Sequence, residues 1–157
     1  MKRIVSRPLE RWVLGFLVFA AVLGAAAAKT FADAPKYQYT VGTDTVLDRK
    51  TGLTWQRAAS SSQYNLGAAV AYCSSLSLAG FSSGWRLPTR HELESLVDRK
   101  VAPPGPTIDK TAFPNTPASR FWTATPYESG WGFDVNFMDG SMHPEQGGYA
   151  FYARCVR

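Results

Sequence analysis

The chain has 157 residues, with 17 Lys and Arg against 12 Asp and Glu, and a formal net charge of +5. Residues 1–28 hold four of the basic residues and one acidic residue, so the rest of the chain has a net charge of only +2 and no basic run longer than a pair. Because a nucleic-acid-binding surface needs clustered Lys and Arg, this composition argues against nucleic acid as a partner.

The N-terminus has the pattern of a secretory signal peptide. Four basic residues precede an uncharged run of 17 residues from Trp12 to Ala28, which is diluted by Ala and Gly. A membrane-spanning helix needs about 20 apolar residues, and this run ends in the small residues that signal peptidase accepts. We therefore expect residues 1–28 to be a signal peptide cleaved after Ala28, with cleavage after Ala32 or retention as an uncleaved anchor as alternatives. Export by the Sec route would make the protein periplasmic, cell-surface or secreted.

The remaining chain is predicted to form a short tether and one domain. Residues 29–38 are mostly small and polar with one Pro, whereas residues 39–157 contain no internal repeat and have the length of a single domain. Two short strands, Val46 to Asp48 and Leu53 to Gln56, flank a turn that contains Gly52. This arrangement predicts a hairpin.

Two helices are predicted in the middle of the chain. The first starts at the N-cap Asn65, and its apolar residues recur with helical spacing up to a stop at Gly80, which places Cys73 on the buried face. The second starts at Thr89, which forms a capping-box pattern with Glu92, and is expected to run to about Asp98.

The C-terminal part is predicted to be a long loop followed by strands. Residues 101–117 contain five prolines, which lack amide donors, so this segment is expected to be a stiff loop. Strands are expected over residues 120–125, over residues 131–137 before the turn at Asp139, and over residues 149–157, where Cys155 shares a face with Phe151 and Ala153. Helices early and antiparallel strands late give an α+β fold class, with two helices packed on short antiparallel sheets with long loops.

The two cysteines, Cys73 and Cys155, have three interpretations: a disulfide, a metal pair or a catalytic thiol couple. An exported context and an even count favour the disulfide. A structural zinc site needs four close ligands, yet there is no Cys-x-x-Cys and only His91 and His143 could complete the set.

Six ordered motifs give the chain a strong resemblance to a known bacterial family. They are VLDRKTGLTWQR, AVAYCSSLSLAGFSSGWRLPTRHELESLVD, IDKTAFPNT, FWTAT, WGFDVNFMDGS and ARCVR, and they span roughly residues 39–157. The chain resembles the domain at the C-terminus of a Legionella collagen-like adhesin, long catalogued as a domain of unknown function. That family is similar in fold to C-type lectin domains and, through WRLPT, distantly similar to the formylglycine-generating enzymes.

The resemblance implies a C-type-lectin-like fold, a structural bridge between Cys73 and the last strand, and an adhesin-like binding function. The chain departs from the family pattern at Gly84, where the family usually has Asp, and at Phe121, Thr123 and Thr125 around FWTAT. The collagen-like repeats of the named adhesin are absent from this sequence.

The stretch from Tyr127 to Glu145 has the residue types of a glycan site. A sugar offers an apolar CH face to aromatic rings and a ring of hydroxyls to carboxylates and amides. The ligand-binding candidates are Tyr127, Trp131, Asp134, Asn136, Asp139, His143 and Glu145. An ordinary solvated hairpin is the alternative interpretation. Calcium could join Asp134, Asn136 and Asp139, but the Glu-Pro-Asn and Trp-Asn-Asp signatures of calcium-dependent lectins are missing, so we predict no metal and no cofactor.

A second candidate site is basic and would suit a sulfated or acidic polysaccharide if its members converge. Its residues are Arg49, Lys50, Arg99, Lys100 and Lys110; solvated charges in turns are the alternative. Arg86 could bind an anion, but we expect it to pair internally with Glu92 or Glu94, and we expect Trp55 and Trp122 in the core.

No Ser/His/Asp order, metal-ligand spacing or free thiol pair indicates an active site, so we expect a non-enzymatic module. It would bind a glycan or another extracellular ligand. An envelope protein-interaction domain is the alternative, and an active distant relative of the formylglycine-generating enzymes is a third, less favoured one.

Overall fold

The structure is a computed structural model that describes residues 38–157. The predicted signal peptide over residues 1–28 lies outside the described residues, as does the predicted tether apart from Gln38. No helix between residues 38 and 157 is long and apolar enough to cross a membrane.

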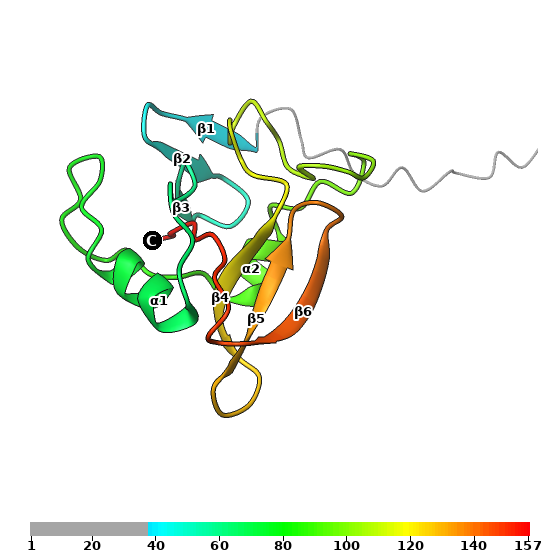
Figure 1. The fold of residues 1–157 in the computed structure, drawn as a ribbon. Helices are drawn as coiled ribbons and strands as arrows, with labels where there is room; N and C mark the ends of the chain where they lie inside the picture. The colour runs from blue at the N-terminus through cyan, green and yellow to red at the C-terminus, as the bar shows by residue number, and fades with distance from the viewer. Residues whose placement is uncertain (1–37) are drawn as a thin grey trace, which may run out of the picture. The chain divides into compact units, whose positions relative to one another are not determined.

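The first sheet contains the predicted hairpin and one further strand. Strands β1 (Tyr39–Val41), β2 (Thr45–Asp48) and β3 (Thr54–Gln56) form an antiparallel sheet in the order β1-β2-β3, visible in cyan to teal in Figure 1. Gly52 takes a φ of +74° in the β2–β3 turn, a conformation that suits glycine. The Asp48 carboxylate accepts the Lys50 amide at 2.9 Å and the Thr51 hydroxyl at 2.8 Å, which fixes the turn.

The second sheet is built from the late strands. It is antiparallel in the order β4-β5-β6, with β4 at Arg120–Pro126, β5 at Trp131–Asn136 and β6 at Ser141–Gln146. The predicted turn at Asp139 and Gly140 joins β5 to β6, and Gly140 has a φ of +76°. In the β5–β6 register Asp134 lies opposite His143 and Asn136 lies opposite Ser141.

Both helices start where the sequence predicts and end earlier. α1 (Leu66–Ser74) is capped by the Asn65 side chain, which accepts the Ala68 amide at 2.8 Å. It stops before Gly80 because the next amide, of Leu76, bonds only three residues back to the Cys73 carbonyl.

α2 (Arg90–Glu94) has the predicted capping box between Thr89 and Glu92. The prediction that it extends to about Asp98 was wrong. The amides of Leu96 and Val97 bond three residues back, and the Asp98 amide leaves the helix to donate to the Thr107 carbonyl at 2.8 Å. The proline-rich loop therefore competes for the end of this helix.

The predicted strand over residues 149–157 is also wrong as a continuous element. This segment forms only isolated bridges, in which Phe151 pairs with Tyr64, Tyr152 with Phe121, and Val156 with both Trp55 and Arg86. Because its partners belong alternately to different parts of the fold, no ladder of more than one residue pair is built. The C-terminus instead runs between the two sheets, as Figure 1 shows in red.

The core has two clusters, which the C-terminal segment joins. One contains Val46, Trp55, Leu93 and Phe121, and so takes side chains from both sheets and α2. The other lies under α1 and contains Trp122 with the disulfide between Cys73 and Cys155. The bridge was expected, and both cysteines have no exposed surface, which agrees with the predicted buried face of α1. Trp55 and Trp122 are fully buried, as predicted.

The segment over residues 101–117 contains no helix or strand, in agreement with its prolines. It is held against the end of the second sheet by two backbone hydrogen bonds of 2.7 Å, from Gly105 to the Met138 carbonyl and from Thr107 to the Phe137 carbonyl. A Cβ on Gly105 would lie 2.3 Å from the Thr107 nitrogen and 2.4 Å from the Phe137 oxygen, so this close approach requires glycine.

Candidate functional site

The second sheet has two chemically different faces. Successive strand residues alternate between faces, so Trp131, Phe133 and Val135 lie on one and Asp134 and Asn136 on the other. α2 contacts β4 and β5 and covers the Val135 end of the first face, whereas α1 contacts β4 from the second face. The Trp131 end of the first face extends past α2 toward the β4–β5 hairpin.

That uncovered end carries a group of rings. Tyr127, which follows β4, is 55% exposed, and its ring lies 5.4 Å from the Phe133 ring and 6.4 Å from the Trp131 ring. Trp131 and Phe133 are half-buried, and the Arg90 guanidinium sits 4.7 Å from the centre of the Phe133 ring. We call these four residues the aromatic surface.

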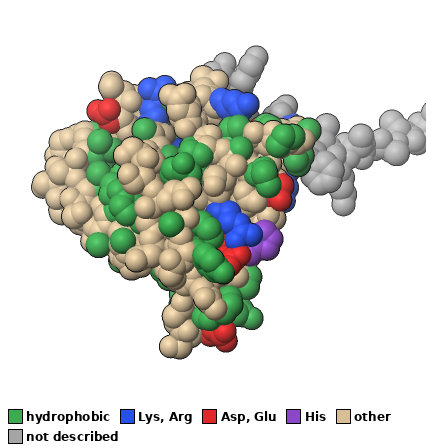
Figure 2. Space-filling model, in the orientation of Figure 1, with side chains coloured by type: hydrophobic (Ala, Val, Ile, Leu, Met, Phe, Trp, Pro, Cys, Tyr) green, Lys and Arg blue, Asp and Glu red, His purple; other side chains and the backbone are tan. Residues whose placement is uncertain are grey.

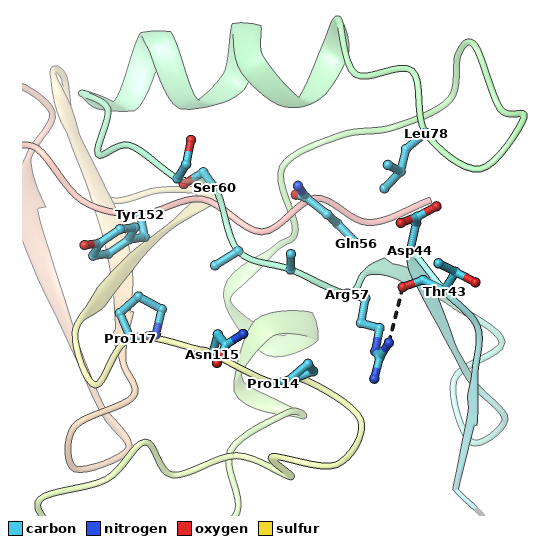
Figure 3. A pocket seen from close by; sticks show the side chains of 13 residues that line it. Thr43, Asp44, Gln56, Arg57, Ser60, Leu78, Pro114, Asn115, Pro117 and Tyr152 are labelled. Atoms are coloured by element: carbon cyan, nitrogen blue, oxygen red, sulfur yellow. Dashed lines mark hydrogen bonds between the residues drawn. The ribbon is translucent and has the colours of Figure 1, made fainter.

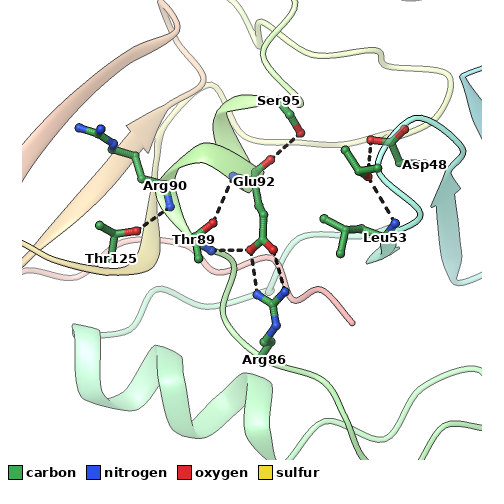
Figure 4. Close-up of polar contacts among 9 residues, drawn as sticks. Asp48, Leu53, Arg86, Thr89, Arg90, Glu92, Ser95 and Thr125 are labelled. Carbon is green, nitrogen blue, oxygen red and sulfur yellow. Dashed lines mark hydrogen bonds and ion pairs between the residues drawn. The ribbon is translucent and has the colours of Figure 1, made fainter.

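Arg90 is positioned by the start of α2. Its backbone amide donates to the Thr125 hydroxyl at 2.9 Å, which fixes the first helical residue against β4 (Figure 4). Arg90 forms no ion pair with any residue in the described part of the chain. An arginine stacked on an aromatic face therefore keeps its charge available to a ligand.

Behind the sheet, on the second face, lies a buried charge cluster of Arg120, Asp134, His143 and Glu145. Asp134 has no exposed surface, and neither of its carboxylate oxygens has a hydrogen bond to another described residue. Its nearest cation is Arg120, at 3.7 Å, which forms a second ion pair with Glu145. Burial raises the pKa of Asp134 to about 6, although Arg120 and His143 act to lower it.

Asp134, at the centre of this cluster, is closed to ligands. The Arg120–Glu145 pair covers Asp134, and the Arg120 guanidinium also lies 5.5 Å from the centre of the Phe151 ring. The Nδ1 atom of His143 is buried without a hydrogen-bond partner among the described residues. The cluster therefore joins β4, β5 and β6 rather than offering a surface.

One side-chain oxygen of Asn136 and one of Asp139 accept hydrogen bonds within the β5–β6 turn. Asn136 accepts the Met138 amide at 3.0 Å, and Asp139 accepts the Ser141 amide at 3.0 Å and the Ser141 hydroxyl at 2.6 Å. These hydrogen bonds hold the pKa of Asp139 below its ordinary value. Among residues 38–157, no group of three or more His, Cys, Asp or Glu side chains is placed to hold a metal ion.

The seven candidates predicted from sequence therefore fall in three places. Tyr127 and Trp131 belong to the aromatic surface; Asp134, His143 and Glu145 to the buried charge cluster; and Asn136 and Asp139 to the turn. Sequence reasoning missed Phe133 and Arg90 as surface residues and Arg120 as the cation of the cluster. The alternation of Trp131 with Phe133 was a signal for the second ring, but no local pattern indicated Arg90 or Arg120.

The five basic candidates are all exposed, and acidic residues adjoin them in sequence. The pKa of Tyr39 is raised by burial and then by the charges of Asp48, Asp109 and Asp98, which places those three carboxylates around one ring. They adjoin the basic positions Arg49, Lys50, Arg99, Lys100 and Lys110 in sequence. On the face drawn in Figure 2, basic and acidic side chains are scattered and do not form one basic patch.

Arg99 and Arg49 are among the basic residues that have partners. Arg99 forms an ion pair with Glu94 at 3.1 Å, and the Arg49 guanidinium donates to the Thr40 hydroxyl at 2.8 Å. The local field is therefore weaker than the count of basic residues suggests.

Arg86 is internally paired, as predicted. Its guanidinium donates twice to the Glu92 carboxylate, at 2.8 and 2.7 Å, and the Thr89 amide adds a third hydrogen bond at 2.7 Å (Figure 4). The Arg86 fork is the main cause that lowers the pKa of Glu92 to about 2. Arg86 thus fixes the entry to α2.

A groove of about 390 Å³ lies away from all the predicted residues. It runs between residues 56–61, which continue from β3, and residues 114–117 of the proline-rich loop, with Tyr152 and Leu78 also lining it (Figure 3). Asp44 is at the same end of the groove as Leu78. No local sequence pattern indicated this groove, because its walls come from five separate segments.

Comparison with known protein families gives a match over most of the chain. The family model of the Lcl C-terminal domain matches residues 44–157. The chain belongs to the Lcl C-terminal domain family. Membership of this family suggests an extracellular or surface-associated module, and the match includes the aromatic surface, the disulfide and all the residues that line the groove except Thr43. No curated protein matches the chain.

Proposed function

We propose that this Lcl C-terminal domain is an exported, non-enzymatic module that binds a glycan through the aromatic surface. The observation that carries the proposal is the exposed Tyr127 beside Trp131 and Phe133, with the Arg90 guanidinium stacked on Phe133. Rings of this kind pack against the apolar CH face of a sugar. The guanidinium supplies several hydrogen-bond donors for its hydroxyl or acidic groups.

Export is part of this proposal. The charged start and apolar run of residues 1–28 support secretion by the Sec route, and the disulfide supports a compartment outside the reducing cytoplasm. N-terminal sequencing of the exported protein should find Lys29 as its first residue. A first residue of Asp33 would move the cleavage site, and Met1 would indicate an uncleaved anchor.

The C-type-lectin-like fold is proposed as the frame of this module. Its support is the combination of two short helices, two antiparallel sheets, long loops and a disulfide from α1 to the C-terminal segment. Catalysis is not part of the proposal. The cysteines are joined to each other and buried, and no metal-binding group is formed within residues 38–157.

A glycan array tests the proposed function with three variants. Wild-type protein should give sugar-specific signals, and Tyr127→Ala and Trp131→Ala should each weaken them about tenfold, as the loss of an aromatic contact does. Tyr149→Ala is the matched control, because Tyr149 is 53% exposed but stacks on Phe151 on the other face of the sheet. Its signals should equal those of the wild type.

Two results would contradict the proposal: an array without any specific signal, or equal losses in Tyr149→Ala and Tyr127→Ala. A chelator should leave the signals unchanged, because the oxygens of Asn136 and Asp139 are engaged in the turn.

The basic residues give a second candidate ligand, a sulfated or acidic polysaccharide. The observation that favours it is that all five basic residues are exposed. Binding to an immobilised heparin-like polymer should be lost in Lys50→Glu and Lys100→Glu and should weaken with salt. Retention that neither substitutions nor salt alter would reject this candidate.

An envelope protein-interaction domain is the alternative function. It is favoured by the groove beside the proline-rich loop, whose lining combines apolar side chains with open backbone.

A further inference from the structure

The groove lies where the chain that follows β3 has separated from β2 but is still hydrogen-bonded to the C-terminal segment. The last register pair between the two strands is Thr45 with Gln56, and the last hydrogen bond runs from the Arg57 amide to the Asp44 carbonyl at 2.9 Å. On the other edge, Gln56 and Ser60 still donate to the Cys155 and Ala153 carbonyls at 2.9 Å. After Arg57 the chain therefore keeps hydrogen bonds to the C-terminal segment and loses those to the β2 side.

Two consecutive residues of this segment have unused peptide groups. Neither the amides nor the carbonyls of Ala58 and Ala59 form a hydrogen bond to another residue in the described part of the chain. Ala58 is exposed and both residues line the groove. Residues 57–60 lie beyond the end of β3 and are not part of a strand, but their free peptide groups can be satisfied by the main-chain groups of an incoming extended chain.

The walls restrict what kind of chain would fit. Pro114 and Pro117 form the opposite wall and have no amide to donate, and the Tyr152 ring and Leu78 add apolar surface (Figure 3). The incoming segment would therefore pair on one side only and place small or apolar side chains against the prolines.

Asp44 supplies charge at one end of the groove. Its carboxylate is exposed and forms no hydrogen bond or ion pair with another described residue. The groove also contains Arg57, whose guanidinium is held by the Thr43 and Ala112 carbonyls at 3.3 Å and points away from Asp44 in Figure 3. Asp44 is therefore the acidic group available to a cationic side chain.

We propose that the groove binds an extended peptide segment of a partner protein through main-chain hydrogen bonds to Ala58 or Ala59, with a Lys or Arg of the segment at Asp44. This site is separate from the aromatic surface and does not depend on glycan binding. Saccharide binding in the same groove is an outcome that the experiment distinguishes.

A library of linear peptides displayed on phage is selected on the purified full chain, and the enriched peptides are synthesised and titrated. The selected peptides should contain a Lys or Arg at a fixed position, and Asp44→Asn should weaken them about tenfold, as expected for loss of a charge-assisted contact. The matched control Tyr127→Ala, on the aromatic surface, should bind them as the wild type does.

Two further measurements keep the test independent of any variant's folding. Two versions of each peptide are compared, one with N-methyl groups at the odd-numbered backbone positions and one with them at the even-numbered positions. One of the two versions should lose binding, because methylation removes the main-chain donors that face the groove. Hydrogen exchange should slow at the amides of Ala58 or Ala59 when the peptide binds.

Failure to select any peptide that binds more tightly than about 100 µM would overturn the proposal. Equal binding of the two N-methylated versions would also overturn it, as would unchanged hydrogen exchange at Ala58 and Ala59. Displacement of the peptides by neutral oligosaccharides would assign the groove to a saccharide. Loss of glycan signals in Tyr127→Ala with intact peptide binding would separate the two sites.

Discussion

Removal of the disulfide should be the most destabilising single covalent change in this fold. Cys73 and Cys155 are 82 positions apart, so the bond closes most of the domain into a loop. In the chain-entropy description, a loop of this length restricts the unfolded state by about 4.5 kcal/mol. That value is comparable with much of the net stability of a small domain. Cys73→Ala with Cys155→Ala is the suitable variant, because both positions are fully buried and Ala introduces no polar group.

The assay is urea unfolding at pH 7, followed by circular dichroism, of the oxidised protein, the reduced protein and the double variant. The free energy of unfolding should fall by about 4 kcal/mol in both the reduced protein and the variant. A variant that stays within about 1 kcal/mol of the oxidised protein would refute the loop argument. Non-reduced tryptic peptides analysed by mass spectrometry should contain the linked pair, and two free thiols would refute the bridge itself.

Three further predictions concern stability. Glu92→Gln should lower the free energy of unfolding by about 1 kcal/mol at pH 7. The depressed pKa of Glu92, about 2, stabilises the fold above pH 4.5, and this stabilisation is lost as the pH falls toward 2. Because Arg86 is half-exposed, the ion pair contributes less than the pKa shift alone implies. Urea midpoints of both proteins should converge at low pH, and a constant difference would contradict the assignment. Asp134 should have the opposite pH dependence, because its pKa in the folded protein is raised to about 6. The stability that this group contributes is fully present below pH 3.8, and about 2 to 3 kcal/mol of it is lost as the pH rises through 6. Asp134→Asn should remove this pH dependence. An unchanged profile between pH 4 and 7 would show that Asp134 does not titrate there. Gly105→Ala should lower the thermal midpoint by at least the equivalent of about 2 kcal/mol, because its Cβ meets backbone atoms, and a wild-type midpoint would disprove that packing.

Local chemistry explains why several elements were predictable from sequence. Asn65 and Thr89 both cap helices because a side-chain oxygen satisfies an otherwise free amide within three residues, which is a property of adjacent sequence. The same applies to the Gly52 turn and to the pairing of Arg86 with Glu92, whose donors and acceptor lie six positions apart.

Features that depend on distant segments were not predictable in the same way. The segment over residues 149–157 has the alternation of a strand, but its neighbours change after each residue pair, so no strand forms. Asp134 has the sequence context of a surface carboxylate and is nevertheless buried, because Arg120 and Glu145 close over it. The aromatic surface needs Arg90, which reaches Phe133 only after α2 packs on the sheet.

The role of the aromatic surface can be tested most directly by tryptophan fluorescence. Among the tryptophans of the described chain, Trp55, Trp85 and Trp122 are buried and Trp131 is half-buried, so Trp131 is the one placed to report a bound ligand. Titration with the strongest oligosaccharide from the array should give a saturable change in emission that is absent from Trp131→Phe. An equal change in that variant, or no change in the wild type at saturating sugar, would contradict glycan binding at this surface.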